Sequence, residues 1–312
     1  MDDPVAQALA LWGMAEARAE FVAGRENRVY RVRTEAGAFA LRIRRPGYRS
    51  DSEIRSELEW LAAMARAGLH VPLPRRALSG ALVETVAGHA VDVIGWLDGR
   101  PMGQSGAPLA LGDPEAVFHR LGGELARLHA ACDAWRPPDG FARAQWDRDG
   151  LLGDAPLWGR FWANPTLDAE TRAVFVRFRD AARAALDGIG PTQDFGLIHA
   201  DPVRENVLLE GDSLRLIDFD DGGYGFRLFD LATALVKNHD EPEYPAMEAA
   251  LIAGYRAVRP LDTGALPLFL AIRAASYVGW IVPRLGEDGG RTRNARLVGQ
   301  ARDICAAWLR EN

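Results

Sequence analysis

The sequence predicts an α+β protein with two lobes, a small lobe built on an antiparallel sheet with one main helix and a larger, mostly helical lobe. Two observations support this prediction. Between residues 19 and 45, polar and apolar side chains alternate with a period of two, which is typical of half-buried strands. Beyond residue 101, apolar side chains mostly recur at helical spacing. A chain of 312 residues is long enough for two cores.

The first lobe is expected to begin with a helix over residues 4–17, because Pro4 is suited to a first turn and apolar residues recur after it. Strands at residues 28–33 and 38–44 then flank a turn at residues 34–37 and form a hairpin. These segments predict a short antiparallel sheet within residues 19–45.

The main helix of this lobe is expected to start at Ser52 and to end at Gly68, since apolar residues form a stripe along one face and glycine commonly ends a helix. Residues 82–86 and 91–94 read as two more strands. The pattern breaks at residues 95–101, which marks the boundary between the lobes. The two lobes are therefore predicted to be residues 1–97 and residues 98–312.

The second lobe is predicted from helical periodicity. Asp113 caps a helix whose first residue is Pro114, and its apolar positions continue through His129, which we expect to be a packed or capping residue. Residues 135–167 are rich in proline and tryptophan and are expected to be mainly loops. Further helices are expected at residues 168–186, from about Asp230 onward, and at residues 243–258, 264–283 and 293–310.

Composition excludes several classes of protein. A net charge of −6 argues against a nucleic-acid surface, which needs excess lysine and arginine. The two cysteines are far apart and predict neither a disulfide framework nor a zinc cluster, so a reducing cytoplasm is expected. The N-terminus does not resemble a signal peptide. No apolar run approaches the ~18 residues of a membrane span, so no membrane partner is expected.

Residues 197–221, LIHADPVRENVLLEGDSLRLIDFDD, carry the strongest chemical signal. They combine the pattern H-x-D-x-x-x-x-N, a turn between two short apolar strands, and the pair Asp218-Phe219. Transfer of a phosphoryl group from ATP needs a carboxylate that accepts the proton of the attacking hydroxyl, and an amide and a second carboxylate that hold Mg²⁺. Asp201 stands in the position of the base, and Asn206 and Asp218 in those of the metal ligands. The alternative is a plain hairpin with capping Asp and Asn residues.

The first lobe offers candidates for the nucleotide side of such a site. Protein kinases carry a lysine on the third strand that pairs with phosphate and with a helix glutamate, and Arg42 occupies that position here. Glu57 is the expected ion-pair partner and Glu53 the alternative. The loop at residues 24–27, which ends at Asn27, is expected to cover the phosphates, although it has a single glycine; the alternative is a plain hairpin turn. Adenine is expected to contact the backbone of the connector at Gly95, Trp96 and Leu97. The alternative for Arg42 is an exposed strand residue, like Arg44 and Arg45.

These segments resemble the aminoglycoside phosphotransferase and choline kinase-like family of the protein-kinase-like fold. The nearest branch contains type II homoserine kinases, hydroxylysine kinases and a bacterial stress-response Ser/Thr kinase. The resemblance implies an ATP-dependent kinase with Mg²⁺, Asp201 as base, Asn206 and Asp218 as metal ligands, and Arg42 paired with Glu57. It rests on Glu26–Val32, Phe39–Ser50, Ser56–Leu61, Leu197–Leu208 and Ile217–Ala232, in the family's order.

The sequence departs from the family pattern at positions that bear on the acceptor. The interior of the loop differs, and Arg204 is expected to touch substrate or phosphate. Asp220 and Asp221 add negative charge near the acceptor, which favours a cationic or zwitterionic small molecule over a neutral sugar, or could hold a second metal ion. Weaker or supporting candidates are Tyr224 and Arg227 in the pocket, His199 in the loop, and Asp230, which is expected to hold the loop backbone.

Three hypotheses follow for the function. The first is a kinase that phosphorylates a hydroxyl of a small amine-like or amino-acid-like acceptor. The second is a protein Ser/Thr kinase of the stress-response type, which would share every catalytic residue. The third is a non-catalytic nucleotide-binding module, which a missing base or metal ligand would favour. All three of Asp201, Asn206 and Asp218 are present.

Overall fold

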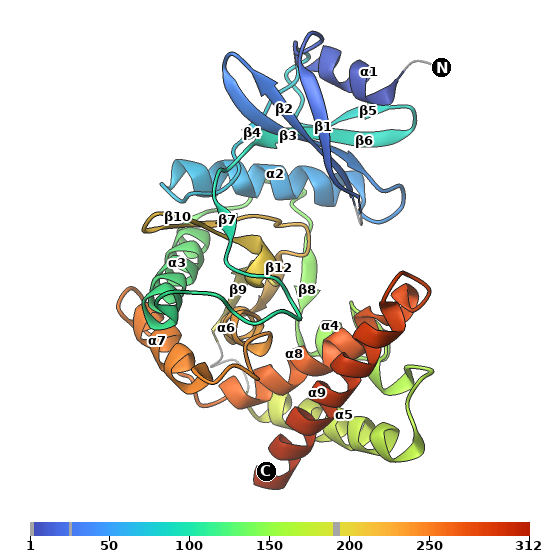
Figure 1. The fold of residues 1–312 in the computed structure, drawn as a ribbon, viewed down its shortest axis with the longest axis vertical. Coiled ribbons are helices and arrows are strands. Elements are labelled where there is room, and N and C mark those ends of the chain that lie inside the picture. Colours follow the sequence, from blue (N-terminus) through green and yellow to red (C-terminus); the bar gives the residue numbers. More distant parts are fainter. Residues whose placement is uncertain (1–2, 25–26, 190–193) are drawn as a thin grey trace. The chain divides into compact units, whose positions relative to one another are not determined.

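The computed structural model describes residues 3–24, 27–189 and 194–312. Its described residues form two compact units. The first unit lies within residues 1–101, 134–143 and 207–220, and the second within residues 102–133, 144–206 and 221–312. The lobe boundary expected between residues 97 and 98 stays a prediction. The α+β class is confirmed, with an antiparallel sheet in the N-terminal region and helices in the C-terminal region (Figure 1).

The first unit is built on an antiparallel sheet in the order β1-β2-β3-β6-β4, with β5 paired to β6. Strands β2 and β3 form the predicted hairpin, and β6 pairs with β3 so that Arg42 lies opposite Asp92. The elements are α1 (Pro4–Leu11), β1 (Arg18–Gly24), β2 (Asn27–Thr34), β3 (Gly37–Arg44), α2 (Asp51–Arg66), β4 (Pro74–Arg75), β5 (Glu84–Val86) and β6 (His89–Gly95).

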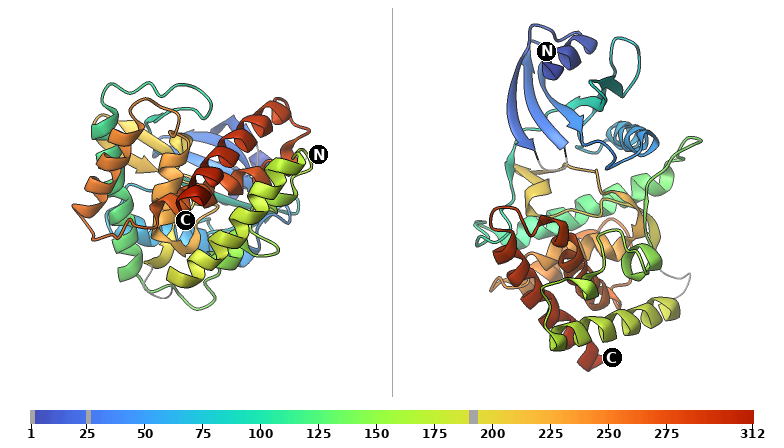
Figure 2. Two further views of the ribbon diagram at one scale, coloured as in Figure 1. Left: turned by 90° about the horizontal axis from the view of Figure 1, so that it is seen from below. Right: turned by 90° about the vertical axis from the view of Figure 1, so that its right-hand side faces the viewer.

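The two faces of this sheet bury different clusters. Leu41 and Ile43 of β3 join Trp12 and other residues in one core, whereas Ala40 joins Ile54 and Leu58 of α2 in another. Because successive side chains of a strand point to opposite faces, this alternation assigns Arg42 to the face that carries α2. The right-hand view of Figure 2 shows α2 beside the sheet.

The boundaries of both helices in this unit follow local chemistry. Ser50 and Glu53 form a reciprocal capping box at the start of α2, which begins within a residue of the prediction. Helix α1 ends at Leu11, several residues earlier than predicted. The reason is Gly13, whose φ of +67° is a left-handed conformation that stops the helix.

Two smaller sheets complete the β structure. In the first unit, β7 (Arg100–Pro101), β10 (Val207–Glu210) and β11 (Ser213–Leu216) form one sheet, in which β10 and β11 are the hairpin predicted after the loop that carries Asp201. In the second unit, β12 (Gly223–Phe226) lies between β8 (Ala144–Trp146) and β9 (Phe195–Ile198). Strand β9 leads directly into that loop.

The second unit is mostly helical, and the helices predicted in it are present, several with shifted ends. They are α3 (Pro114–Ala134), α5 (Ala169–Ile189), α6 (Arg227–Val236), α7 (Tyr244–Arg256), α8 (Leu266–Trp280) and α9 (Gly290–Glu311). The stretch expected to be loops also contains β8, α4 (Arg148–Leu152) and the 3₁₀ turn η1 (Phe161–Ala163). Further 3₁₀ turns are η3 (Arg204–Asn206) and η4 (Val282–Arg284). Within the described ranges, no helix is long and apolar enough to cross a membrane.

Candidate active site

The loop between β9 and η3 holds Asp201 in a defined position. The Nδ2 group of Asn206 donates to the backbone oxygen of Asp201 at 2.9 Å and to its Oδ2 at 3.0 Å. These two hydrogen bonds fix the amide plane of Asn206 and occupy both of its N–H groups. Its remaining polar atom is an oxygen, which is the kind of ligand that a divalent cation such as Mg²⁺ takes.

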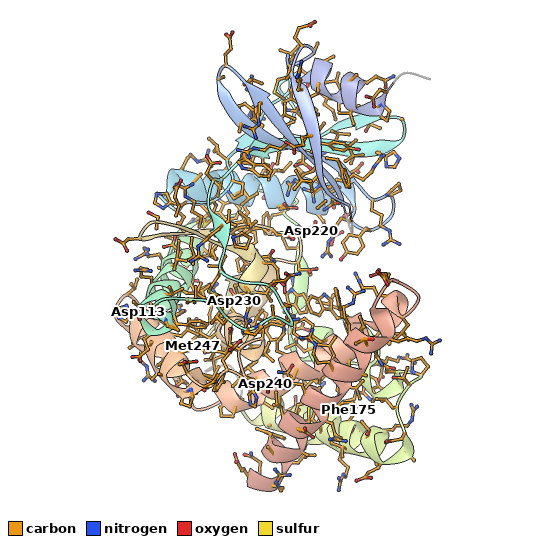
Figure 3. The ribbon with its side chains drawn as sticks, in the orientation of Figure 1. Asp113, Phe175, Asp220, Asp230, Asp240 and Met247 are labelled. Carbon is orange, nitrogen blue, oxygen red and sulfur yellow. The ribbon has the colours of Figure 1, made fainter. Side chains whose placement is uncertain are left out.

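Asp230 holds the backbone of the same loop from behind. Its carboxylate accepts hydrogen bonds from the N–H groups of His199 at 2.8 Å and Ala200 at 2.7 Å, as the sequence predicts. Ala200 has a φ of +66°, which is uncommon for a residue other than glycine. The two bonds to one buried carboxylate stabilise this turn just before Asp201. Figure 3 shows Asp230 among the side chains of its unit.

A buried histidine supports Asp230. The Nε2 of His129 lies 3.0 Å from Oδ2 of Asp230, and its Nδ1 lies 2.8 Å from the hydroxyl of Tyr255. Burial lowers the pKa of His129 to about 4, although the hydrogen bond to Asp230 opposes this shift. The imidazole is therefore neutral at pH 7. It donates to the carboxylate through Nε2 and accepts from Tyr255 through Nδ1. His129 is thus a packed residue, as predicted.

Arg273 of α8 contacts the other oxygen of Asp201, and sequence reasoning did not single it out. Its Nη2 donates to Oδ1 of Asp201 at 2.6 Å and to the hydroxyl of Tyr277 at 3.0 Å. The guanidinium carbon lies 4.0 Å from the centre of the Trp158 ring and 4.4 Å from that of Tyr277. The available signal was an arginine within the otherwise apolar segment LPLFLAIRAASYVGW.

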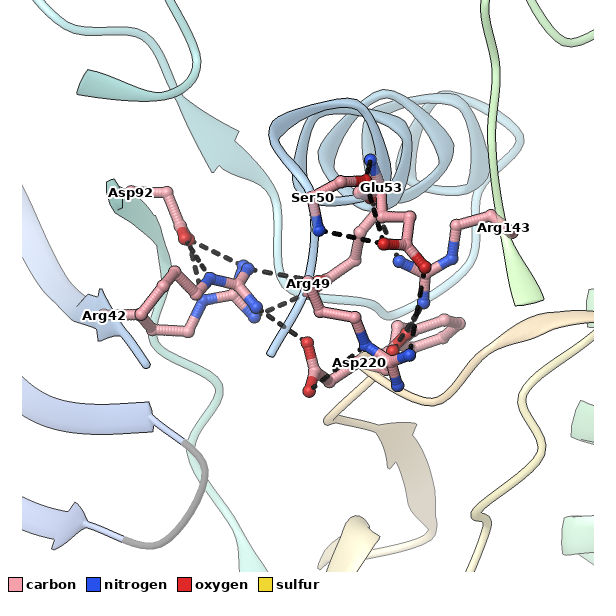
Figure 4. A network of polar contacts seen from close by, with 10 residues as sticks. Arg42, Arg49, Ser50, Glu53, Asp92, Arg143 and Asp220 are labelled. Atoms are coloured by element: carbon pink, nitrogen blue, oxygen red, sulfur yellow. Dashed lines mark hydrogen bonds and ion pairs between the residues drawn. The ribbon is translucent and has the colours of Figure 1, made fainter. Parts of the chain in front are cut away.

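The first unit contains a buried network of charges on the α2 face of its sheet (Figure 4). Arg42 donates through Nη1 to Glu57 at 2.7 Å and through Nε to Asp92 at 2.7 Å. Glu57 is therefore the partner, as predicted. Glu53, the alternative, instead caps α2 through Ser50. Burial alone would raise the pKa of Glu57, but the charges of Arg42 and Arg44 outweigh it and lower this pKa to about 2.

The structure contradicts the alternative in which Arg42 is an exposed strand residue, and it corrects the expectation that Arg44 is exposed. Arg44 is buried and donates to Asp92 at 2.6 Å and to Asp220 at 2.9 Å. Arg45 alone of the three arginines is exposed. Arg44 and Arg42 stand two residues apart on one strand and therefore share a face. Asp92 was missed, and its signal was a carboxylate between the buried Val91 and Val93.

Asp220 does not present the free negative charge that we expected near the acceptor. It is buried, and its carboxylate forms a salt bridge with Arg44. Arg143 donates to the backbone oxygens of Phe219 and Asp220, at 2.7 Å in each case. The side chain of Asp220 is thereby neutralised within the first unit. This residue no longer supports a cationic acceptor or a second metal ion.

Arg204 was expected to touch substrate or phosphate, and the structure contradicts this. The side chain is buried, and its Nε donates to Asn238 at 2.8 Å. Its Nη1 donates to the backbone oxygen of Ala107 at 2.7 Å, and its Nη2 to Glu241 at 2.6 Å. All three nitrogens of the guanidinium therefore donate within the second unit. Their hydrogen bonds connect the segment after β7 with the end of α6.

Other predicted residues lie as follows. The N–H groups of Gly95 and Trp96 donate to the backbone oxygens of Leu73 and Ala38, so neither N–H is available to adenine, whereas Leu97 follows the strand. Of the turn expected over the phosphates, Arg25 and Glu26 lie outside the described residues, and Asn27 begins β2. Three predicted residues belong to the second unit. Tyr224 lies on β12, and the backbone oxygen of Asp221 accepts a hydrogen bond from Trp146. Arg227 forms a salt bridge with Asp133.

Asp218 has a φ of +65° and stands in the segment that Arg143 holds. It belongs to the first unit, whereas Asp201 and Asn206 belong to the second. The pairing of Asp218 with Asn206 on one metal ion therefore stays a prediction. Among the residues that the structure describes, no cluster of three or more His, Cys, Asp or Glu side chains forms a metal site.

Comparisons with known proteins identify relatives of this chain. A model described as the phosphotransferase enzyme family matches residues 18–261. A homoserine kinase of Chelativorans sp. strain BNC1 is 31% identical over 90% of this chain and 81% of its own. An amicoumacin kinase of Bacillus subtilis is 26% identical over 96% of this chain and 90% of its own. A solved structure of a microcompartment-associated aminopropanol kinase is 28% identical, with a TM-score of 0.85 over 98% of this chain and 97% of that one. The protein-kinase-like fold is thereby confirmed.

Proposed function

Because the chain belongs to the phosphotransferase enzyme family and is an ATP-dependent kinase, we propose that it phosphorylates a hydroxyl of a small amine-like or amino-acid-like acceptor, with Asp201 as base. The observation that carries this proposal is the setting of the Asp201 carboxylate. One oxygen is held by Asn206 and the other by Arg273, yet the side chain is 22% exposed. It is therefore oriented and still accessible, as a general base must be.

In the proposed reaction, Asp201 accepts the proton of the acceptor hydroxyl as its oxygen attacks the γ-phosphorus of ATP. A phosphate ester and ADP result. Asn206 keeps the carboxylate aimed by donating to both its side chain and its backbone oxygen. Asp230 fixes the preceding turn, so the base does not have to be ordered during the reaction.

A divalent metal fits the residues that the sequence assigns to it. The amide of Asn206 has both N–H groups occupied and offers its oxygen, and Asp218 offers a carboxylate. Oxygen ligands of this kind, completed by phosphate oxygens and water, suit Mg²⁺. A bound Mg²⁺ would neutralise the charge of the phosphates. We propose Asn206 and Asp218 as its protein ligands.

On the nucleotide side, we propose that Arg42 and Glu57 have the positioning role of the lysine and glutamate of protein kinases. Arg42 also engages Asp92, so much of its donor capacity is used within the protein. Leu97 is the proposed contact of adenine in the connector. The turn ending at Asn27 is the proposed cover of the phosphates.

The choice of a small acceptor is supported by the relatives. By their names, the three proteins above act on homoserine, amicoumacin and aminopropanol, which are small molecules. Homoserine and aminopropanol both carry an amine and a hydroxyl. This favours the first hypothesis over a protein Ser/Thr kinase or a non-catalytic module. Location in the cytoplasm stays a prediction.

The test is ADP release from Mg·ATP with a panel of hydroxylated amines, hydroxylated amino acids, aminoglycosides and a generic protein substrate. We expect stimulation by one of the small acceptors. Asp201→Asn should lower kcat by about 10²–10⁴-fold, because an amide cannot take the proton. Asp303→Asn, at an exposed position on α9, is the matched control and should keep full activity. A mutant at Asp201 that retains most of its rate would refute this role.

A further inference from the structure

Arg273 contains buried donors that no residue of the described chain satisfies. The side chain is fully buried, and its Nη2 is used by Asp201 and Tyr277. Its Nε and Nη1 have no hydrogen-bond partner within the described ranges. Leaving a buried polar group unpaired costs roughly 1–3 kcal/mol, and more when it is charged. Such groups call for a partner that the protein chain itself does not supply.

A second cation lies on the same tyrosine. The Nζ of Lys237 is 3.9 Å from the centre of the Tyr277 ring, whose hydroxyl accepts from Arg273. Lys237 is half-buried and makes no hydrogen bond or salt bridge with any residue that the structure describes. The chain has 37 lysine and arginine residues in all, and Lys237 is its only lysine. In so arginine-rich a chain, the one compact ammonium group stands near the base.

The charges around these two residues leave a positive excess. Arg273 and Lys237 are cationic. Asp201 forms a salt bridge with Arg273, and it is the acid whose charge acts most strongly on Lys237. Glu205 lies further along the loop, where it is engaged by the N–H and hydroxyl of Ser105. Burial lowers the pKa of Lys237 to about 8, and the charge of Asp201 opposes this shift. An anionic ligand group would offset the desolvation of both cations.

The aromatic residues beside the base also favour an anionic ligand group. Rings that could surround an ammonium ligand are already occupied by the protein's own guanidinium, which lies 4.0 Å from the centre of Trp158 and 5.2 Å from that of Phe229. A cationic group of the acceptor would meet like charge there. A carboxylate would instead find two sets of unsatisfied donors.

We propose that Lys237 and Arg273 bind a carboxylate of the acceptor, so that the substrate is a hydroxylated amino acid rather than the corresponding amino alcohol. This inference rests on the proposed function and names its substrate class. Arg273 thereby joins Asp201 to the acceptor, because its Nη2 orients the base while its Nε and Nη1 face the ligand carboxylate. Binding of the carboxylate at one end of the acceptor then positions the reacting hydroxyl at its other end.

The first test uses the wild-type protein and does not require turnover. An amine-acetylating reagent at pH 7.5 modifies Lys237 and the α-amino group of the chain, and peptide mass spectrometry gives the ratio of the two. Serine, homoserine and 5-hydroxylysine are each compared with the amino alcohol that lacks the carboxylate. We expect at least one amino acid to lower the ratio several-fold while its amino alcohol leaves it unchanged. Equal protection by both members of each pair, or none by any amino acid, would overturn the proposal.

The second test measures acceptor preference. For the amino acid that protects Lys237, Lys237→Met should lower the ratio of kcat/KM for the amino acid to kcat/KM for its amino alcohol by about ten- to a hundred-fold, since a hydrogen bond to a charge is lost. Arg284→Met, which removes the cation that lies over Trp280 and belongs to η4, is the control and should leave the ratio unchanged. An unchanged ratio in Lys237→Met would refute the inference while leaving the kinase assignment intact. Absence of turnover with every acceptor would instead count against the proposed function.

Discussion

Asp230 organises the loop that carries Asp201, and we assign it no part in the proposed proton transfer. Its carboxylate is fully buried and accepts from two successive backbone N–H groups and from His129. A buried carboxylate needs such partners, because an unpaired one would carry a large desolvation cost. The partners also determine the shape of the turn at Ala200. The same bonds that stabilise Asp230 therefore position Asp201.

The neutral state of His129 gives a pH dependence with a definite sign. Its pKa in the folded protein is about 4, below the ordinary value near 6.5, so the folded state binds fewer protons than the unfolded state between these values. The free energy of unfolding is therefore expected to fall as pH drops from 6.5 towards 4, by about 3 kcal/mol from this residue.

Urea unfolding at pH 7.5 and pH 4.5 checks this. His129→Gln cannot titrate and should lose less stability on acidification than the wild type. His70→Gln, at an exposed position, is the control and should behave like the wild type. If His129→Gln and the wild type lose equal stability over this range, the histidine is not held neutral.

Helices α3 and α7 approach each other so closely that glycine is needed at the contact. A Cβ on Gly254 would lie 1.8 Å from the backbone oxygen of His119, and one on Gly122 would lie 2.0 Å from that of Leu251. This contact brings Tyr255 of α7 to His129 of α3. The spacing of the two helices therefore determines the hydrogen bond between Tyr255 and His129, the residue that donates to Asp230.

Gly254→Ala is therefore expected to destabilise the protein by about 3 kcal/mol, the upper part of the range for overpacking, because the obstacle is backbone. Gly299→Ala in α9 is the matched control. A Cβ there meets nothing within 4 Å, so the better helix propensity of alanine should stabilise the protein by about 0.5–1 kcal/mol. Chemical unfolding of both variants measures the difference. Equal effects at the two positions would contradict the close approach.

Strand β3 shows the limit of periodicity as a guide. The alternation of residues 38–44 predicted the strand correctly, and one face was expected to be solvated. Both faces are buried, since Arg42 and Arg44 are covered by α2 and neutralised by Glu57, Asp92 and Asp220. Charged residues usually mark an exposed face, but partners from distant segments make their burial tolerable.

Binding of the metal together with the nucleotide should stabilise the folded protein. Mg·ATP at about 100 times its Kd would contribute ~2.7 kcal/mol, which corresponds to a rise in Tm of roughly 5 °C for a chain of this size. Chelation of the metal should abolish most of this shift. The reason is that the proposed ligands Asn206 and Asp218 hold the nucleotide through the ion.

Thermal unfolding with Mg·ATP, with ATP and EDTA, and without ligand provides the measurement. Asp218→Ala should remove most of the stabilisation by Mg·ATP. Glu210→Gln, in the neighbouring hairpin and salt-bridged to Arg215, should keep it. A normal shift in Asp218→Ala would refute the role of Asp218 as a metal ligand.

Residue types and short spacings in the sequence were enough for the family, the fold class and the proposed chemical groups. Local hydrogen bonds and helix periodicity act over a few residues, so most helices, the main strands and the loop motif could be read directly, whereas β8 and α4 lie in a stretch that was expected to be mainly loops. The partners of charged residues could not be predicted in this way. Arg44 and Asp220 are 176 positions apart in the chain, and Arg273 and Asp201 are 72 positions apart. Only folding brings such groups together, and their burial then decides which charges remain for a substrate. For this reason Asp220 and Arg204 are no longer assigned to the acceptor site, and Arg273 and Lys237 are proposed for it instead.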